Sequence, residues 1–366
     1  MLKKLLWKFG PLFALVAILV FFALAERYWG QGQFLSTRNF RVMMSSAALI
    51  AVPAFGMTII IISGGIDLSA GTALTLCGTV LAVMLKNAPT AAPDTFFGDD
   101  ALAFTLWMFF ALVLMTLTGA GCGLINGTII SATKVVPFIV TLGTMTIYLG
   151  VGQILSNEST VYAPKENVPE WLNLCYTGRI AENYLIPPIN LFGQEITFKI
   201  PSSVIITVIL AVMAGILMRQ TVFGRNVFAI GSSESTARLC GINAPLTLMA
   251  VYTLSGVFVA IGGLLYYADV KNGNPSDGQG KELEIIAAVV LGGGSLSGGR
   301  GSIIGTMIGA LIITAIRNGC GLLSIPNTYT YIIIGCIIIV AVVVDQLRHG
   351  SPEWFFQMIS RKTKTS

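Results

Sequence analysis

Few side chains in this sequence could do chemistry, and those that could lie within or beside long apolar runs. The polar candidates are Asp67, Asn126, Thr141, Thr144, Thr146, Gln153 and Asn318. Because amide and hydroxyl groups can donate and accept hydrogen bonds, Asn126, Thr141 and Thr144 could line a path for a hydroxyl-rich solute, or equally bond one helix to another. Asp67 sits at a predicted turn near the inner surface, where we favour a structural role, as a hydrated cap of the next helix, over contact with a solute.

The sequence shows no carboxylate pair, no cluster of histidine and cysteine, and no nucleophile constellation of the kind that enzymes and metal sites need. The single histidine, His349, cannot build a metal site or a catalytic triad, and the six cysteines show no paired spacing. Residues 294–301 almost fit a phosphate-binding loop, but Arg300 replaces its lysine and Gly301 removes the hydroxyl that would hold magnesium. We therefore predict no catalytic residue, no metal site and no nucleotide bound by this chain.

The composition indicates a membrane protein. Of the 366 residues, 54% are apolar and 11% are charged, and the mean hydropathy is +0.80, whereas soluble domains carry about 25% charged residues. About ten charge-free runs approach the length that crosses a bilayer, and they are Phe9–Ala25, Val42–Ile66, Leu68–Leu85, Phe104–Ile130, Val135–Asn157, Ser202–Met218, Leu246–Ala268, Ile285–Gly299, Gly301–Ile316 and Thr328–Val344. We expect an all-α, polytopic protein with a single transmembrane domain over residues 1–366.

Two of these runs, Ile285–Gly299 and Gly301–Ile316, are short and rich in glycine. They could be two helices joined by a tight turn, or one broken helix and its return. Small-residue series such as Gly119–Gly127 and Gly301–Gly309 predict close helix packing. The interior is poor in charge, and proton pumps and ion-coupled carriers usually need buried ionisable relays. We therefore expect a protein that moves a solute with energy supplied from elsewhere.

Basic residues indicate the orientation of the runs, because they are retained on the cytoplasmic side. With the N-terminus inside and ten alternating spans, more lysines and arginines lie inside than outside, and most acidic residues lie outside. Both termini are therefore predicted to be cytoplasmic. An alternative is cleavage of the first run, since Lys3, Lys4 and Lys8 precede it and Ala23–Ala25 resembles a signal-peptidase site. We favour a retained anchor.

Two glycine-rich segments share the pattern GGxxLSxG, one over residues 64–71 and the other over residues 292–299. Each follows a run that descends to the inner face, so they could mark duplicated halves, about 1–200 and 201–366, with a solute path between them. Chance is the alternative in a chain with 40 glycines. The positions that we assign to the path or its hinges are Gly64, Gly65, Asp67, Ser69, Asn126, Thr141, Thr144, Gly292, Gly293, Ser297 and Asn318.

The long polar segment Arg219–Pro245 lies in the middle of the chain, on the predicted cytoplasmic side. We predict a turn over residues 221–225, an apolar run over Val227–Ile230, and a short helix over Ser233–Leu239. Ser232 or Ser233 could cap this helix, and Gly241 and Pro245 are expected to stop it. A simple connector would need far fewer residues, so we predict that a soluble partner docks here. A solvated loop is the alternative.

Three outer loops are also predicted, over residues 86–103, 158–201 and 269–284. The simplest interpretation is that these loops are solvated connections between helices. The long 158–201 loop, with its prolines and Trp171, could instead form a platform for an external binding protein, or a gate.

Four stretches resemble the membrane permease subunits of bacterial ATP-binding-cassette importers for ribose, xylose and galactose. They span both halves of the chain: Ala54–Gly71 (AFGMTIIIISGGIDLSAG), Gly123–Thr146 (GLINGTIISATKVVPFIVTLGTMT), Thr221–Asn243 (TVFGRNVFAIGSSESTARLCGIN) and Glu282–Leu311 (ELEIIAAVVLGGGSLSGGRGSIIGTMIGAL). Two departures are mild: Ser233-Glu234 stands where family members usually show Asn-Glu or a similar pair, and Glu284 stands where aspartate is common. Relatives within this family carry nucleosides, autoinducer furanoses or branched-chain amino acids.

The resemblance implies a sugar permease in the bacterial inner membrane, surrounded by lipid and paired with a second copy or a paralogue. It implies a cytoplasmic ATPase partner that binds the ATP and magnesium, and an extracytoplasmic sugar-binding protein, with no nucleic acid partner. It also implies that the 219–245 segment contacts the ATPase. The residues that we assign to this coupling are Gly224, Arg225, Ala229, Gly231, Glu234, Ala237, Arg238 and Gly241. The alternative from another class is a carrier that works without partners.

Overall fold

The computed structural model describes residues 2–30, 32–89, 99–176, 189–191, 194–196 and 200–349. Apart from one short hairpin, β1 (Ile189–Leu191) and β2 (Gln194–Ile196), the regular structure in these ranges is helical. The predicted all-α, polytopic membrane protein is therefore confirmed. Within the described part of the chain, seven helices are long and apolar enough to cross a membrane.

Each of the ten predicted apolar runs holds a helix. The long ones are α1 (Leu2–Trp29), α2 (Thr37–Ile62), α3 (Ala70–Lys86), α4 (Asp99–Thr133), α5 (Pro137–Leu155), α7 (Ser202–Gln220), α10 (Ala244–Val270), α12 (Ile303–Leu322) and α13 (Asn327–His349). The run Ile285–Gly299 gives only α11 (Lys281–Leu291), whose 11 residues extend about 16 Å, roughly half of a bilayer core. The glycine-rich pair is thus two helices, α11 and α12, and α11 is too short to span.

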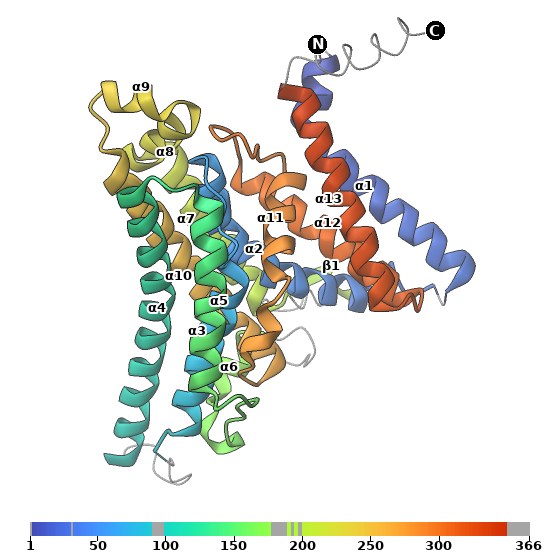
Figure 1. Cartoon of the computed structure of the whole chain (residues 1–366). Coiled ribbons are helices and arrows are strands. Elements are labelled where there is room, and N and C mark those ends of the chain that lie inside the picture. The colour runs from blue at the N-terminus through green and yellow to red at the C-terminus, as the bar shows by residue number, and fades with distance from the viewer. Residues whose placement is uncertain are drawn as a thin grey trace, which may run out of the picture.

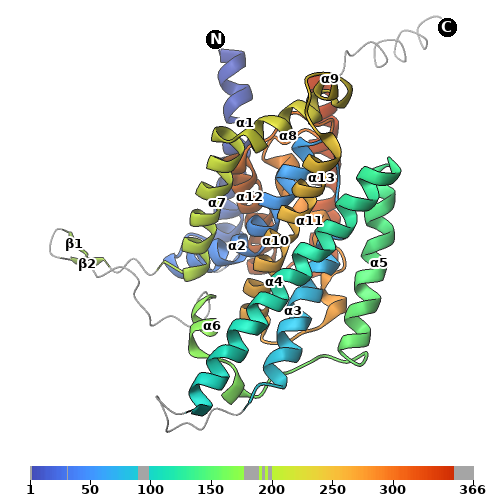
Figure 2. The ribbon, with the colours of Figure 1, turned by 90° about the vertical axis from the view of Figure 1, so that its left-hand side faces the viewer.

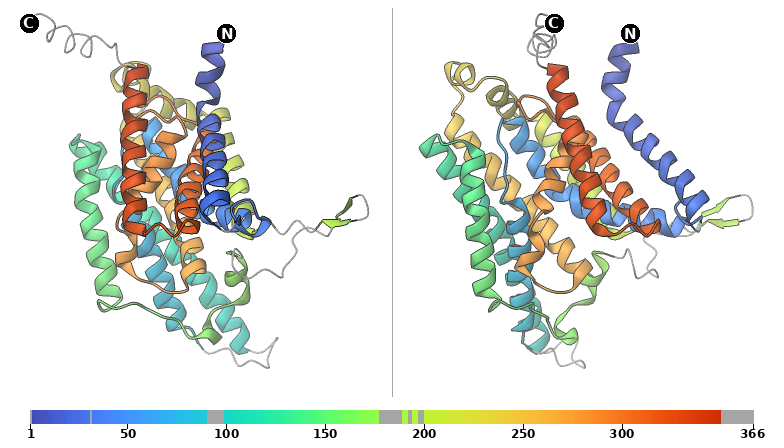
Figure 3. Two further views of the ribbon diagram at one scale, coloured as in Figure 1. Left: turned by 90° about the vertical axis from the view of Figure 1, so that its right-hand side faces the viewer. Right: turned by 45° about the vertical axis from the view of Figure 1, so that its right-hand side comes forward.

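The core is built around α2 and α10. Helix α10 packs against α4, α2 and α3, while α12 packs against α2, α11 and α1. Figure 2 shows α3 and α4 side by side, and Figure 3 shows α1 and α13 on the opposite side of the molecule from α4 and α5. The start of α1, the last turns of α13 and the helices α8 (Val222–Ser232) and α9 (Glu234–Leu239) lie at one end (Figure 1).

Glycines allow the closest of these contacts, as the small-residue series predicted. On α4, Gly119, Gly123 and Gly127 recur every fourth residue and face α10, where a Cβ on Gly119 or Gly123 would overlap the backbone of Gly256 or Tyr252. Gly305 and Gly292 bring α12 against the end of α11 in the same way. Because no side chain separates these backbones, each helix pair gains extensive van der Waals contact.

The outer loops are partly folded rather than simple connections. The 158–201 loop contains η1 (Lys165–Asn167) and α6 (Glu170–Leu174), and Val161 pairs with Gly273 in an isolated antiparallel bridge. Asn167 Nδ2 donates to Leu85 O at 3.0 Å. In the 269–284 loop, η2 (Pro275–Gly278) packs against α3, where Thr75 Oγ1 donates to Pro275 O at 3.0 Å. Residues 177–188 and 90–98 of these loops lie outside the described residues.

The central polar segment forms two helices where one was predicted. Thr221 Oγ1 accepts from Gly224 N at 3.2 Å and so caps α8, which covers both the predicted 221–225 turn and the Val227–Ile230 run. The predicted turn is wrong because a threonine at this position satisfies the free N–H groups of a first helical turn. Ser233 caps α9 as predicted, accepting from Thr236 N at 3.3 Å.

Gly241 ends α9 as predicted, with a φ of +81°. The Gly241 N–H donates to Arg238 O and the Ile242 N–H to Ala237 O, which satisfies the last carbonyl groups of the helix. Pro245 was predicted to help stop this helix and instead stands in the first turn of α10, which Asn243 caps. A proline is tolerated there because the first N–H groups of a helix have no partner within it.

Candidate solute path and coupling surface

Asp67 and its hydrogen-bond partners form a buried polar cluster at the start of α3. Asp67 Oδ1 accepts from Ser69 N at 2.8 Å and from Ser69 Oγ at 2.6 Å. From α4, Asn126 Nδ2 donates to Ser69 Oγ at 2.8 Å and lies 3.5 Å from Asp67 Oδ1. Asp67 is only 5% exposed, so it is not hydrated at a surface as predicted. Its bond to Ser69 N instead makes an Asx turn that leads into α3.

Helix α5 closes the other side of this cluster. Thr141 Oγ1 accepts from Leu68 N at 3.1 Å and lies 3.3 Å from Ile66 O, to which it can donate. Thr144 Oγ1 donates to Thr141 O at 3.3 Å within the same helix. Tyr148 Oη lies 2.8 Å from Cys122 O and 3.2 Å from Asn126 Oδ1. In this conformation Thr141 and Asn126 therefore bond one segment to another, which is one of the two predicted alternatives.

The two glycine-rich segments end their preceding helices with the same hydrogen bonds. After α2, Gly64 N donates to Ile61 O and Gly65 N to Ile60 O; after α11, Gly293 N donates to Val290 O and Gly294 N to Val289 O. Gly64 has a φ of +89° and Gly293 a φ of +88°, so each takes the left-handed position that closes a helix.

Gly64 and Gly293 are thus the structurally equivalent positions. The sequence match instead pairs Gly64 with Gly292, so the two alignments differ by one residue. Beyond the helix ends the segments diverge, because α3 starts at Ala70 whereas Gly298 and Gly299 also take positive φ angles before α12. Duplication of the two halves remains a prediction.

Both glycine segments meet the central segment at one backbone junction. Gly299 N donates to Ile62 O at 2.8 Å, which joins the second glycine segment to the end of α2. Gly231, in the last turn of α8, lies against both groups, because a Cβ there would overlap Ile62 O and would stand 2.7 Å from Gly299 N. A Cβ on Gly298 would in turn stand 2.6 Å from Gly231 O and 3.1 Å from Gly64 Cα. The last turn of α8 is therefore in direct backbone contact with the end of α2 and with the Gly298–Gly299 segment.

The predicted coupling residues divide into an exposed set and a packed set. Arg225, Glu234, Arg238 and Gly241 are exposed, and Arg238 Nη2 lies 2.6 Å from Glu234 Oε1 across one turn of α9. The packed residues are Gly224, which lies against the backbone of Met218, Gly231 in the junction, Ala237, which is buried with Ile230 and Ala244, and Ala229, which packs against that small core. The packed set holds α8 and α9 against the membrane helices, while the charged side chains of the other set are exposed.

The remaining predicted path residues lie elsewhere. Asn318, on α12, forms a reciprocal amide pair with Asn39 near the start of α2, with Nδ2-to-Oδ1 distances of 2.9 and 2.8 Å. Ser297 is exposed in the segment between α11 and α12, and Gly292 packs on Gly305. None of these residues belongs to the cluster around Asp67.

Sequence reasoning missed several polar residues that the structure places at these contacts. Tyr148 follows Thr144 by four residues and Thr141 by seven, a spacing that puts all three on one face of a helix and could have identified it. Tyr252 Oη is buried against Gly65, and no hydrogen-bond partner for it is found in the described part of the chain. Glu284, placed in an outer loop by the sequence, lies in α11 and pairs with Arg317 of α12.

The chain matches the family model described as "Branched-chain amino acid transport system / permease component" over residues 40–342. It is similar to the ribose import permease of Bacillus subtilis (strain 168), with 32% identity over 339 residues, covering 93% of this chain and 92% of that protein. It is also similar to the xylose transport system permease of Haemophilus influenzae, with 32% identity covering 91% of this chain and 94% of that protein. The galactose/methyl galactoside import permease of Escherichia coli (strain K12) is 32% identical, covering 87% and 89%. No solved structure matches the chain.

Proposed function

This chain belongs to the family of branched-chain amino acid transport system permease components, and we propose that it is the membrane permease subunit of an ATP-driven importer for a small sugar. One observation carries this proposal: similarity extends over about nine-tenths of the chain to permeases named for ribose and xylose. The family description itself names branched-chain amino acids. A nucleoside, an autoinducer furanose or a branched-chain amino acid is therefore the alternative cargo.

The polar chemistry of the interior favours a neutral, hydroxylated cargo. The buried side chains around the α2–α3 connection include Ser69, Asn126, Thr141 and Thr144, which can each donate and accept hydrogen bonds. An amino acid carries an ammonium and a carboxylate group, whose transfer through an apolar interior needs charged or strongly polar partners. In this conformation Ser69 bonds to Asn126 and to the carboxyl group of Asp67. Thr141 and Thr144 bond to backbone groups. A solute path between these side chains would open when the α2–α3 connection, α4 and α5 move apart.

The energy source is proposed to be a cytoplasmic ATPase that binds the ATP and magnesium, so that this chain is not itself an enzyme. A sugar-binding protein outside delivers the cargo, and a second copy of the chain or a paralogue completes the path. Both termini and the α8–α9 pair face the cytoplasm of a bacterial inner membrane. The orientation is supported by the common end at which α1 starts, α13 finishes and α8 and α9 lie (Figure 1), and by the excess of basic residues predicted on that side.

The contacts of α8 suggest how the ATPase drives transport. Exposed Arg225, Glu234 and Arg238 present charge to the partner, while Gly231 touches the end of α2 and the Gly298–Gly299 segment. Closure of the ATPase would displace α8 and α9, and the junction would carry that displacement to Gly64 and Gly293, which allow the backbone to turn. Two packed arrangements of this junction would then correspond to outward and inward openings.

Reconstitution tests the proposal. The purified chain is placed in vesicles alone, with its ATPase, and with both the ATPase and a sugar-binding protein, and uptake of radiolabelled ribose, xylose and leucine is measured. We expect ATP-dependent uptake of a sugar only with all the partners. Because coupling between two binding sites is reciprocal, the loaded binding protein should also change the affinity of the ATPase for nucleotide. Uptake by the chain alone would support the stand-alone carrier, and uptake of leucine would support the other cargo.

A further inference from the structure

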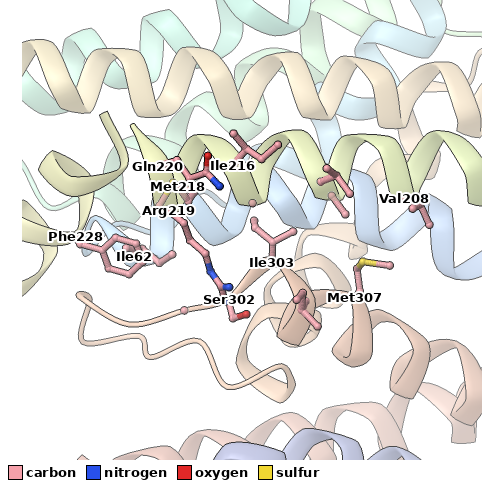
Figure 4. A pocket seen from close by; sticks show the side chains of 15 residues that line it. Ile62, Val208, Ile216, Met218, Arg219, Gln220, Phe228, Ser302, Ile303 and Met307 are labelled. Carbon is pink, nitrogen blue, oxygen red and sulfur yellow. The ribbon is translucent and has the colours of Figure 1, made fainter. Parts of the chain in front are cut away.

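A cavity of about 340 Å³ opens between α7, the start of α12 and α8 (Figure 4). Most of its 15 lining residues are apolar, and Val208, Val212 and Ile216 form the α7 wall. These three side chains are also among the exposed large hydrophobic residues of the chain. Since the outer surface of a membrane-spanning helix faces lipid, the cavity is open to acyl chains.

The cavity continues along the same helices. A second cavity of about 100 Å³ lies between α2, α7 and α12 and shares Val208 and Met307 with the first. Together they follow α7 from Gln220 to Val204, which corresponds to about 24 Å of helix. One leaflet of a bilayer core is roughly 15 Å thick. The groove is therefore long enough to hold an acyl chain from the membrane surface to the midplane.

One end of the groove is polar and cationic. Arg219, Gln220 and Ser302 line that end, and in Figure 4 the Arg219 side chain extends toward Ser302. None of the lining residues is acidic. Arg219 is exposed, and no ion pair involves it among the residues that the structure describes. Arg300, next to Gly301 of the lining, is a second exposed cation.

We propose that this groove binds an anionic phospholipid, with the phosphodiester at Arg219 and one acyl chain lying along α7 and α12. The arginine suits the phosphate, and the apolar length suits the acyl chain, because the roughly 24 Å that the groove follows along α7 exceeds the roughly 15 Å depth of one leaflet core. Basic pockets between transmembrane helices at the cytoplasmic surface are a recurring form of anionic lipid site. The choice of leaflet rests on the proposed cytoplasmic placement of the end of α7.

The bound lipid would lie beside the coupling element. Ile62 and Phe228 also line the cavity, and Ile62 accepts the hydrogen bond from Gly299 in the backbone junction. An acyl chain in the groove would pack against the end of α2 and against α8. Anionic lipid is therefore expected to influence how the junction moves as well as how stable the chain is.

Photocrosslinking of the full-length chain tests this proposal directly. Vesicles carry a trace of photoreactive phosphatidylglycerol or photoreactive phosphatidylcholine, and labelled peptides are mapped by mass spectrometry. We expect the anionic probe to label peptides of α7 and the start of α12. Arg219→Gln should lower that yield by about fivefold, while Lys86→Gln, at the far end of α3, should leave it unchanged.

A second variant tests the site by filling the groove with a larger side chain. Gly215 lines the cavity and a Cβ on it would meet no atom within 4 Å, so Gly215→Leu should fold and should exclude the acyl chain. Gly121→Leu on α4, where a Cβ also meets nothing, is the matched control. Loss of labelling in Gly215→Leu alone would support the site.

Three results would overturn the proposal. Equal labelling by both lipids would indicate an ordinary lipid-facing surface, and competition by inorganic phosphate would indicate a small-anion site. Crosslinks between two copies of the chain through α7 would make the groove a subunit interface. Labelling is measured without transport, so failure of the lipid site and failure of the proposed import function are distinguishable.

Discussion

The backbone of Gly231, in the last turn of α8, lies directly against the carbonyl group of Ile62, the last residue of α2. The same carbonyl accepts the hydrogen bond from Gly299. Three segments that are far apart in the sequence thus meet without an intervening side chain. The contact places the central segment directly against the end of α2 and the Gly298–Gly299 turn.

Gly231→Ala should therefore destabilise the chain and impair transport. Alanine is the better helix former by up to about 1 kcal/mol, but its Cβ would overlap Ile62 O, and overpacking of this kind costs about 1–3 kcal/mol. Gly121→Ala, on α4 where a Cβ meets no atom within 4 Å, should be neutral or slightly stabilising. Thermal unfolding of both purified variants measures the difference. Equal stability of the two variants would show that α8 is not held against α2 as described.

The buried cluster around Asp67 leads to a second prediction. Asp67→Leu removes the acceptor for Ser69 Oγ and Ser69 N, and a buried group left without a partner costs about 1–3 kcal/mol. Asp67→Asn keeps an oxygen acceptor but loses the charge, so its cost should be smaller. The expected order of unfolding temperature is wild type, then Asp67→Asn, then Asp67→Leu.

Thr253→Val is the control for that series, because among the described residues Thr253 Oγ1 bonds only to Met249 O of its own helix, and its loss should have little effect. An Asp67→Asn protein at least as stable as the wild type would contradict the prediction. It would indicate that the carboxyl group is not charged in the folded chain.

Local patterns predicted much of this structure. Apolar runs located the helices, the cap at Ser233 and the stop at Gly241 were found from residue type, and the family resemblance is confirmed by the matched relatives. Hydropathy could not separate α11 from the segment after it, because residues 292–299 are glycine-rich and uncharged although they form no helix.

Contacts between distant segments could not be read from the sequence. Asp67, Asn126 and Thr141 were each suspected for their polarity. No pattern indicated that Asn126 lies at Asp67 and that Thr141 bonds the backbone of the neighbouring Leu68. The reciprocal pair of Asn318 with Asn39 likewise depends on the approach of α12 to α2. The Gly231–Ile62 contact involves backbone alone, so no residue type at Ile62 signals it.

Cysteine labelling tests the proposed orientation at cysteines that the chain already contains. Cys240 is exposed directly after α9, whereas Cys175 is half-buried in the 158–201 loop. A membrane-impermeant maleimide should label Cys240 in inside-out vesicles and spare it in right-side-out vesicles, and Cys240→Ser should remove the signal. Burial raises the pKa of the Cys175 thiol, so less of it is thiolate near neutral pH and its labelling from outside should be slower. Labelling of Cys240 from outside would invert the topology.

The ion pair between Glu234 and Arg238 separates a structural role of α9 from a docking role. Both side chains are between 42% and 49% exposed, and an exposed pair one turn apart contributes about 0.3–0.5 kcal/mol, which corresponds to roughly a twofold effect. If these charges contact the ATPase, Glu234→Arg should lower uptake and stimulated ATP hydrolysis by more than tenfold while membrane insertion is unchanged. Arg225→Glu, which breaks no ion pair among the described residues, should do the same.

The exchanged variant Glu234→Arg with Arg238→Glu decides between the two roles. It restores an ion pair within α9 but presents reversed charges to a partner, so uptake should stay low if the surface docks the ATPase. Recovery of uptake in the exchanged variant would show that the ion pair stabilises α9 and does not dock the ATPase. Circular dichroism of each variant checks that helical content is retained, and co-purification with the ATPase measures docking independently of transport.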